Sequence, residues 1–201
     1  VKKNLRWYWF DGLFSAANDN IYLTYLSVYI LALGATRAQI GLLSSLSSLS
    51  AALLLLPGAF LVERFGRRKQ FTVIFGGVIA RLMILLIALA PLMFEAPGIV
   101  WFAIAIAVAR DAFANLAFPG WMSITGDIVP YEGRGRYFGS RNFVMAIAGM
   151  LTTLLVGELI TRAGSPLGYQ VAMGIAFVLG MAGTSSFGQI ADPKHRATSV
   201  S

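Results

Sequence analysis

Four charged side chains lie deep within the long apolar segments of this 201-residue sequence: those of Asp19, Arg81, Arg110 and Asp111. A charged group near the centre of a bilayer costs about 2.5–3.5 kcal/mol on insertion scales, so its presence calls for an ion pair or a functional role. At 1.5 Å per residue, Asp19 lies roughly 13 Å into its segment, and the other three lie at a similar depth in theirs. The sequence therefore predicts a charged cluster near the midplane, in which Asp19 pairs with Arg110 when the site is empty.

Polar and aromatic side chains form a regular stripe beside Asp19. At intervals of four, three, four, three and four positions, the sequence carries Asp11, Ser15, Asn18, Tyr22, Tyr25 and Tyr29. On an α-helix this spacing places them on one continuous face. Such a face is expected to line a water-filled cavity or to contact a polar helix rather than lipid. The alternative is that the tyrosines are ordinary packing residues and that Asp19 only pairs with Arg110.

A second polar pair extends this pattern to another apolar segment. Asp111 and Asn115 are four positions apart, near Pro119 and Gly120, which can bend a helix beside a cavity. The candidate residues of a solute pathway are therefore Asn18, Asp19, Tyr22, Tyr25, Arg110, Asp111 and Asn115.

These side chains must be positioned by membrane helices. The chain is 57% hydrophobic and only 12% charged, whereas a soluble domain carries about 25% charged residues. The apolar segments predict an all-α membrane protein with six spans, at about 10–33, 40–62, 71–94, 99–124, 143–160 and 168–190. Residues 1–190 would form one six-helix bundle, and 191–201 a polar tail at the start of a central cytoplasmic loop. In the last span, small residues every four positions indicate close helix packing.

Basic residues are distributed unevenly over the loops of this six-span arrangement. Of the 16 Lys and Arg residues, only Arg37 and Arg162 fall on one side, and Arg81 and Arg110 lie within spans. The other twelve share the opposite side: Lys2, Lys3, Arg6, Arg64, Arg67, Arg68, Lys69, Arg134, Arg136, Arg141, Lys194 and Arg196. Basic loops stay in the cytoplasm, so both termini are expected there, in an inner or plasma membrane of the bacterial type. The same distribution argues against nucleic acid as a partner.

Enzyme chemistry finds little support in the sequence. The single histidine, His195, follows the last span, so no imidazole is available at membrane depth for a protease or a metal centre. Cysteine is absent, and no phosphate-binding Gly-x-x-x-x-Gly-Lys-Ser/Thr loop is present. No catalytic residue, metal site or cofactor is therefore predicted.

The charged turn between the second and third spans carries a family resemblance. Glu63-Arg64-Phe65-Gly66-Arg67-Arg68-Lys69 resembles the signature loop of the major facilitator superfamily, whose pattern is Gly-x-x-x-Asp-Arg-x-Gly-Arg-Arg. Ala59 replaces the first glycine, and Glu63 replaces the aspartate while retaining its charge. After the fourth span, Asp127, Pro130 and Arg134-Gly135-Arg136 are similar to a second pattern of that family.

The resemblance implies a fold of twelve spans in two bundles, with the solute held between them near the midplane. This chain is similar to the amino-terminal bundle, a 3+3 repeat of helices whose partner is the missing carboxy-terminal half or a second copy. The implied function is secondary active transport of a small solute by alternating access, with a proton or sodium ion as candidate coupling ion. Ala114 and Leu116 stand where the family's proton-antiport pattern has glycines, which argues against proton antiport. The alternative is a non-transporting membrane scaffold or receptor with the same fold.

The signature loop is also expected to act as a gate. Arg67 lies four positions after Glu63 and is expected to reach Asp127, so that the charges hold one conformation closed. The alternative is that these charges only set topology. The candidate gating residues are Glu63, Arg64, Gly66, Arg67, Arg68, Asp127 and Arg134.

Overall fold

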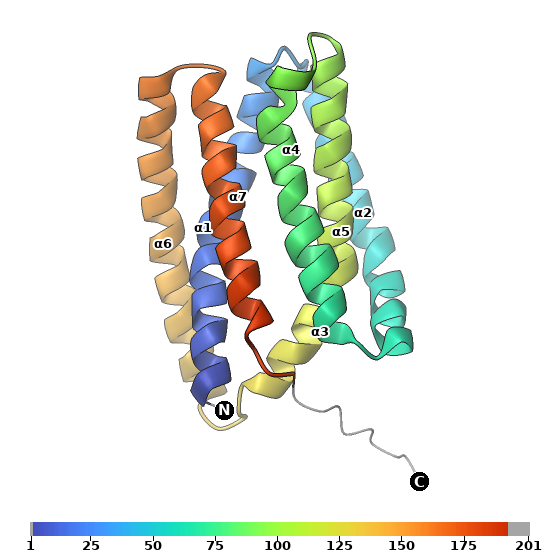
Figure 1. The fold of residues 1–201 in the computed structure, drawn as a ribbon, viewed down its shortest axis with the longest axis vertical. Coiled ribbons are helices and arrows are strands. Elements are labelled where there is room, and N and C mark those ends of the chain that lie inside the picture. The colour runs from blue at the N-terminus through green and yellow to red at the C-terminus, as the bar shows by residue number, and fades with distance from the viewer. Residues whose placement is uncertain (1, 193–201) are drawn as a thin grey trace.

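The computed structural model describes residues 2–192, and every regular element within this range is a helix. The elements are α1 (Lys2–Ala32), α2 (Arg37–Phe65), α3 (Arg68–Phe71), the π-helix η1 (Thr72–Ile79), α4 (Ala80–Met93), α5 (Gly98–Ile128), α6 (Arg134–Ala163) and α7 (Leu167–Gly188). The long helices stand side by side as an upright bundle (Figure 1). The beginning of α1, the end of α7 and the turn between α2 and α3 lie at the same end of it.

Local sequence signals set the ends of α2. Thr36 caps its first turn by a capping box, in which the Thr36 hydroxyl accepts a hydrogen bond from the Gln39 backbone and the Gln39 side chain accepts one from the Thr36 backbone. At the other end, Gly66 adopts the left-handed conformation with φ 61°, which glycine enters without steric cost. The chain can therefore reverse direction there and begin α3 directly after Arg67.

Within residues 2–192, five helical segments have the length and apolar composition to cross a membrane: α2, the continuous stretch Arg68–Met93, α5, α6 and α7. The helix α1 spans 31 residues, so it has the length, but charged and amide side chains such as Asp11, Asn18 and Asp19 make it less apolar. It is therefore not among the five.

Several helices extend beyond the spans predicted from the sequence. The first predicted span begins at residue 10, but α1 begins at Lys2. The segment from Arg134 to Arg141, predicted to be a charged loop, forms the first two turns of α6. Arginine favours helix, and no proline interrupts the segment, so the helix continues past the apolar boundary. Of the predicted polar tail, only Ala191 and Asp192 lie within the described residues.

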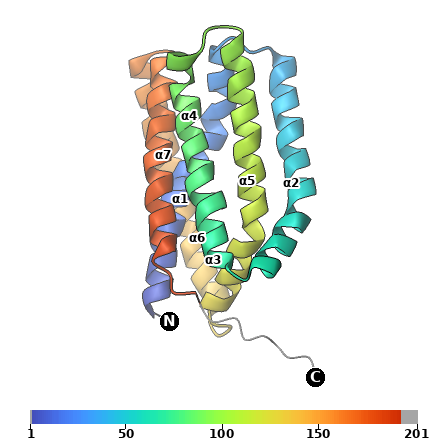
Figure 2. The same ribbon diagram turned by 45° about the vertical axis from the view of Figure 1, so that its right-hand side comes forward.

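The helices pack in two groups that meet at the centre of the bundle. The helix α1 packs mainly against α6 and α7, whereas α5 packs against α2, η1 and α4. Contacts of α4 with α7 join the two groups, and Figure 2 shows α4 between α7 and α5.

Two apolar cores occupy different levels of the bundle. The larger core contains Ile21, Ile84, Ala103 and Met173, all fully buried. The smaller core surrounds Tyr8 and Ile124 nearer the termini. Asp11 and Asp19 of α1 and Arg110 and Asp111 of α5 lie between these two levels, so they occupy an intermediate layer of the protein.

Small residues let the helices approach each other closely. In α7, Ala172, Ala176, Gly180 and Thr184 are all buried, as expected for the predicted packing stripe. The closest approach involves Gly58 of α2, where a Cβ atom would collide with the backbone carbonyl of Leu116 in α5. Backbone cannot move aside as a flexible side chain can, so this position requires glycine.

We expect Gly58→Val to lower the free energy of unfolding by about 1–3 kcal/mol, because the added side chain forces α2 away from α5. Gly41→Ala is the matched control: Gly41 lies in the same helix, and no atom lies within 4 Å of the position that its Cβ would take. That substitution should leave stability unchanged or raise it by up to about 1 kcal/mol. Chemical unfolding of both variants in detergent micelles measures the difference, and equal stabilities would contradict the packing described here.

Candidate functional site

A cavity of about 500 Å³ lies within the bundle and is lined by side chains from α1, η1, α4, α5, α6 and α7. Its size is in the range of small-molecule binding sites. Its charged lining residues are Asp11, Asp19, Arg81, Arg110 and Arg141. The cavity is therefore the place where the ionisable residues of the intermediate layer converge.

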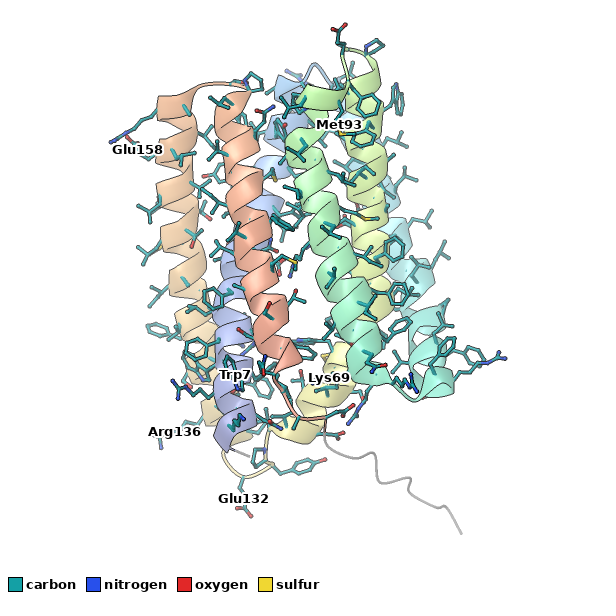
Figure 3. All side chains as sticks on the ribbon, in the orientation of Figure 1. Trp7, Lys69, Met93, Glu132, Arg136 and Glu158 are labelled. Carbon is teal, nitrogen blue, oxygen red and sulfur yellow. The ribbon has the colours of Figure 1, made fainter. Side chains whose placement is uncertain are left out.

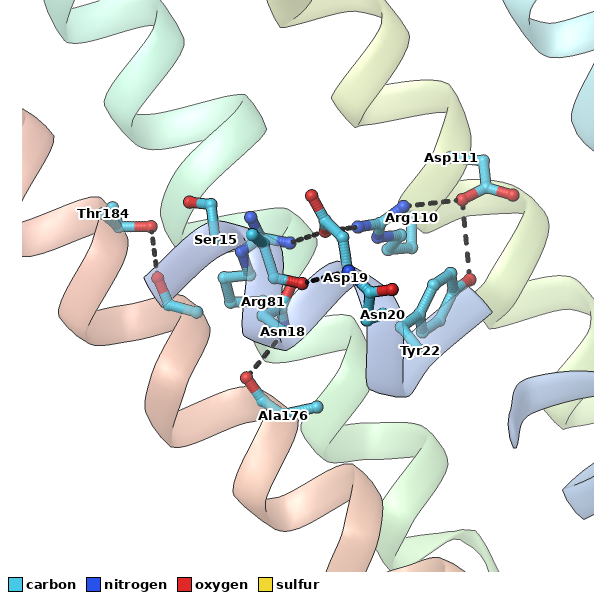
Figure 4. Close-up of polar contacts among 12 residues, drawn as sticks. Ser15, Asn18, Asp19, Asn20, Tyr22, Arg81, Arg110, Asp111, Ala176 and Thr184 are labelled. Carbon is cyan, nitrogen blue, oxygen red and sulfur yellow. Dashed lines mark hydrogen bonds and ion pairs between the residues drawn. The ribbon is translucent and has the colours of Figure 1, made fainter. Parts of the chain in front are cut away.

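The centre of this site is a carboxylate shared by two arginines. Arg81 Nη1 and Arg110 Nη2 each donate a hydrogen bond of 3.2 Å to the same oxygen, Oδ1 of Asp19. The two arginine side chains are only 10% and 11% exposed, whereas that of Asp19 is 44% exposed. Figure 4 shows the aspartate between the two guanidinium groups. The predicted pair of Asp19 and Arg110 is present, and Arg81 joins it from the neighbouring helix.

Arg110 has further partners on the side opposite Asp19. Its Nη1 donates a 3.0 Å hydrogen bond to Oδ1 of Asp111, and its guanidinium lies 4.2 Å from the ring centroid of Tyr22. The Tyr22 hydroxyl donates to the same Asp111 oxygen at 3.5 Å. Two carboxylates and an aromatic face thus stabilise one buried cation, as burial of a charge requires.

The local sequence explains how Arg81 reaches the site. It follows the π-helix η1, a rare helical form that is frequent near functional sites, and Gly76 and Gly77 of this segment leave room for α5 and α7. On α7, a Cβ atom at Gly180 would lie 2.6 Å from the Arg81 side chain. A larger residue there would displace the guanidinium, so the α7 packing stripe also shapes the site.

Of the seven predicted pathway residues, Asp19 and Arg110 line the cavity and the other five do not. Tyr22 and Asp111 contact Arg110 behind the cavity wall, and the remaining three make interhelical hydrogen bonds. Asn18 Nδ2 donates to the Ala176 carbonyl at 2.6 Å, and the Tyr25 hydroxyl donates to the Thr153 carbonyl at 2.7 Å. Asn115 Nδ2 donates to Ser50 Oγ at 3.3 Å. These bonds tie α1 to α7, α1 to α6 and α5 to α2. A role for these residues in a solute pathway stays a prediction.

A second charged pair, which the sequence reasoning missed, lines the cavity nearer the termini. Arg141 lies 3.8 Å from Oδ2 of Asp11, donates a 3.3 Å hydrogen bond to the Tyr8 carbonyl and covers the Tyr8 ring. Arg141 was expected on a loop because it belongs to a basic cluster. Its spacing of seven from Arg134, two helical turns, is the signal that could have placed it on a helix.

The signature loop forms an ionic cluster through Arg68. The Arg68 Nη2 atom lies 2.6 Å from Oδ2 of Asp127 and 2.8 Å from Oδ1 of Asp192, and its Nη1 donates to Ser123 Oγ at 2.7 Å. The predicted partner of Asp127 was Arg67, and this is wrong. Arg67 is exposed and occupies the position before α3 without a side-chain capping hydrogen bond, whereas the following residue, Arg68, is buried and directed towards α5.

The remaining candidate gating residues have simpler surroundings. Glu63 and Arg64 are exposed at the end of α2. Arg134 donates hydrogen bonds to the carbonyls of Gly126 at 2.8 Å and Val129 at 2.7 Å, and so caps the end of α5. Asp192, which the sequence reasoning assigned to a tail, belongs to the Arg68 cluster.

Comparison with known proteins places the whole bundle in one family. Residues 9–199 match the sequence model described as Major Facilitator Superfamily. No curated protein matches the chain. Within residues 2–192, no group of three or more His, Cys, Asp or Glu side chains is arranged to hold a metal ion.

We expect Arg68→Gln to lower the free energy of unfolding by about 1–3 kcal/mol, because it leaves Asp127 and Asp192 close together without their shared cation. Arg67→Gln removes the same charge from the adjacent, exposed position and should change stability by less than about 0.5 kcal/mol. Unfolding of both variants in the same detergent provides the comparison. Equal effects of the two substitutions would show that Arg68 has no special part in closing this end of the bundle.

Proposed function

The chain belongs to the major facilitator superfamily, and from that premise we propose that it is a secondary transporter that moves a small solute by alternating access. It corresponds to the amino-terminal six-span bundle of such a transporter. The observation that carries the proposal is the cavity of about 500 Å³ with Asp19, Arg81 and Arg110 at its centre. Buried charges at this depth are costly, and they are typical of substrate and ion pathways.

The proposal takes α1 as the sixth span. It runs alongside the five apolar helices (Figure 1), and polar residues such as Asp11 and Asn18 are buried in the bundle. The packing also supports a 3+3 repeat. One triplet consists of α1, α2 and the segment Arg68–Met93, and the other consists of α5, α6 and α7. The first helix of the first triplet, α1, packs on α6 and α7 of the second. The first helix of the second triplet, α5, packs on α2, η1 and α4 of the first.

The basic end of the bundle is proposed to face the cytoplasm, together with both termini. Figure 3 shows Lys69 and Arg136 at the end where α1 begins, with Met93 and Glu158 at the opposite end. Positively charged loops resist translocation, which supports this orientation. Lys194 and Arg196, which contributed to the predicted asymmetry, lie outside the described residues.

A second bundle is proposed to cover part of the apolar surface. On α2, Leu53 and Leu56 are 60% and 79% exposed, and on α6 Leu154 and Leu155 are 64% and 72% exposed. These exposed leucines would contact lipid tails or a second six-span bundle. That bundle would be a carboxy-terminal half or a second copy of this one. Rocking of the two bundles would then expose the cavity to each side in turn.

The Arg68 cluster is proposed to hold one of these conformations. It links α3, α5 and the segment after α7 through one buried arginine. Rocking would separate Arg68 from Asp127 or Asp192, so the cluster would act as a latch at the cytoplasmic end.

A proton or a sodium ion is the candidate coupling ion, with the half-exposed carboxylate of Asp19 as its candidate site.

We expect Asp19→Asn to reduce transport at least about ten-fold, which corresponds to about 1.4 kcal/mol, because the neutral amide no longer balances Arg81 and Arg110. Membrane insertion should survive. Proteoliposomes of the full-length protein are offered a defined mixture of organic acids, amines, amino acids and sugars, and accumulated solutes are measured by mass spectrometry.

Glu158→Gln is the control, because it removes a carboxylate that is exposed and pairs only with the exposed Arg162. It should transport as the unmodified protein does. Normal transport by Asp19→Asn would contradict the assigned pathway. If the unmodified protein accumulates no solute above empty liposomes, the scaffold or receptor alternative gains support instead.

A further inference from the structure

We propose that the cavity binds a small organic anion with an apolar body, and that the bound anion replaces the carboxylate of Asp19 between Arg81 and Arg110. This inference rests on the proposed transport function and names the class of its solute. In this account the two arginines bind the solute, and Asp19 is an internal competitor that occupies their donors in the empty state.

The two guanidinium groups have more donors than the described residues satisfy. Each guanidinium has five N–H donors, yet Arg81 donates to one oxygen of Asp19, and Arg110 donates to that same oxygen and to Asp111. The Nε atoms of both arginines are buried without a hydrogen-bond partner. Buried donors without acceptors are unfavourable. A ligand with two or three acceptor oxygens would satisfy more of these donors than Asp19 does.

Asp19 is the member of this group that is free to leave. Its side chain is 44% exposed, whereas the arginine side chains are 10% and 11% exposed. Arg110 is also fixed by Asp111 at 3.0 Å and by the ring of Tyr22. Arg110 is therefore held by partners other than Asp19, and Arg81 is held by its burial against Gly180 of α7, so the carboxylate between them can turn towards the cavity.

The pairing of the charges in the site favours an anion over a cation. Three arginines and two aspartates line the cavity, and Asp111 behind Arg110 makes the group neutral when the site is empty. If an anion takes the place of Asp19, both buried arginines keep a counter-charge, and Asp19 gains solvent. A cationic solute would instead have to draw Asp19 from two arginines and would leave them without it, which is costly in a buried site.

Much of the remaining cavity wall is apolar and aromatic, beside the polar side chains of Ser15, Thr72, Asn142 and Thr184. Phe118 and Trp121 line it with rings stacked at 5.8 Å, and Leu23, Val73, Met145 and Phe187 add aliphatic, thioether and aromatic surface. These apolar side chains line the same cavity as the guanidinium groups of Arg81 and Arg110. They would accept the apolar part of a ligand while the arginines hold its acidic group. A simple probe with both features is phenylacetate.

Binding to the purified full-length protein in detergent tests the proposal by titration calorimetry. Three probes share a phenyl ring and differ in charge: phenylacetate, 2-phenylethylamine and 2-phenylethanol. Phenylacetate should bind at least about ten-fold more tightly than the other two, since one charge-assisted hydrogen bond alone supplies such a factor. Acetate, which lacks the apolar body, should bind more weakly than phenylacetate.

Asp19→Asn supplies the decisive variant, because the proposal predicts a gain of affinity that misfolding cannot imitate. With the competing carboxylate removed, phenylacetate should bind at least about ten-fold more tightly, although transport falls. Arg81→Gln and Arg110→Gln should each weaken its binding by a similar factor. Glu158→Gln and Arg162→Gln, which alter an exposed ion pair at the far end of α6, should leave the affinity unchanged.

Two results would overturn the inference. One is that 2-phenylethylamine binds more tightly than phenylacetate and that the Asp19→Asn variant no longer binds 2-phenylethylamine. Asp19 would then be a ligand for cations. The other is failure of Asp19→Asn to bind phenylacetate more tightly than the unmodified protein does. Either result is compatible with transport of a cationic or neutral solute, so it would refute the anion site and leave the proposed transport function standing.

Discussion

One carboxylate shared by two buried arginines is the interaction on which this protein is organised. Asp19 accepts hydrogen bonds from Arg81 and Arg110 between two apolar cores of a bundle that is otherwise rich in leucine, isoleucine and alanine. An isolated charge in such surroundings would be strongly unfavourable. Three helices must therefore place their ionisable residues at the same level. The remaining structure can be understood as the packing that brings α1, α4 and α5 to this point.

The same helices also connect the central site to the Arg68 cluster. Arg68 and Arg81 belong to one continuous helical segment, Arg68–Met93. Arg110 and Asp111 share α5 with Ser123 and Asp127. A displacement of the Arg68–Met93 segment relative to α5 therefore changes both clusters together. Because packed helices have discrete arrangements, two ionic clusters on one pair of helices would couple solute binding to opening of the latch in the proposed transporter.

Two features of this arrangement could be predicted from the sequence: the depth of the charged residues in the membrane and the family to which the signature loop belongs. Residue counts along the apolar segments placed Asp19 and Arg110 at the same level, and the loop from Glu63 to Lys69 identified the family. The pairing of Arg68 rather than Arg67 with Asp127 could not be predicted, because it depends on how the turn at Gly66 orients α3. Periodicity likewise placed Asn18 and Tyr25 on one helix face without revealing which neighbouring helix that face meets. Arg141 and Asp192 were missed because their charge suggested solvent, whereas each lies beside opposite charges contributed by distant segments.

The most direct test of the account is whether the cavity around Asp19 is open to aqueous solutes. These 201 residues contain no cysteine, so the test can use this bundle without a competing thiol of its own. Ser15→Cys places a thiol in the cavity wall, and Met173→Cys places one in the fully buried core. The account predicts that a small charged thiol reagent modifies the first variant much faster than the second, and that phenylacetate slows this modification. Equal, slow modification of both positions would contradict the claim that the Asp19 cavity is a solute pathway.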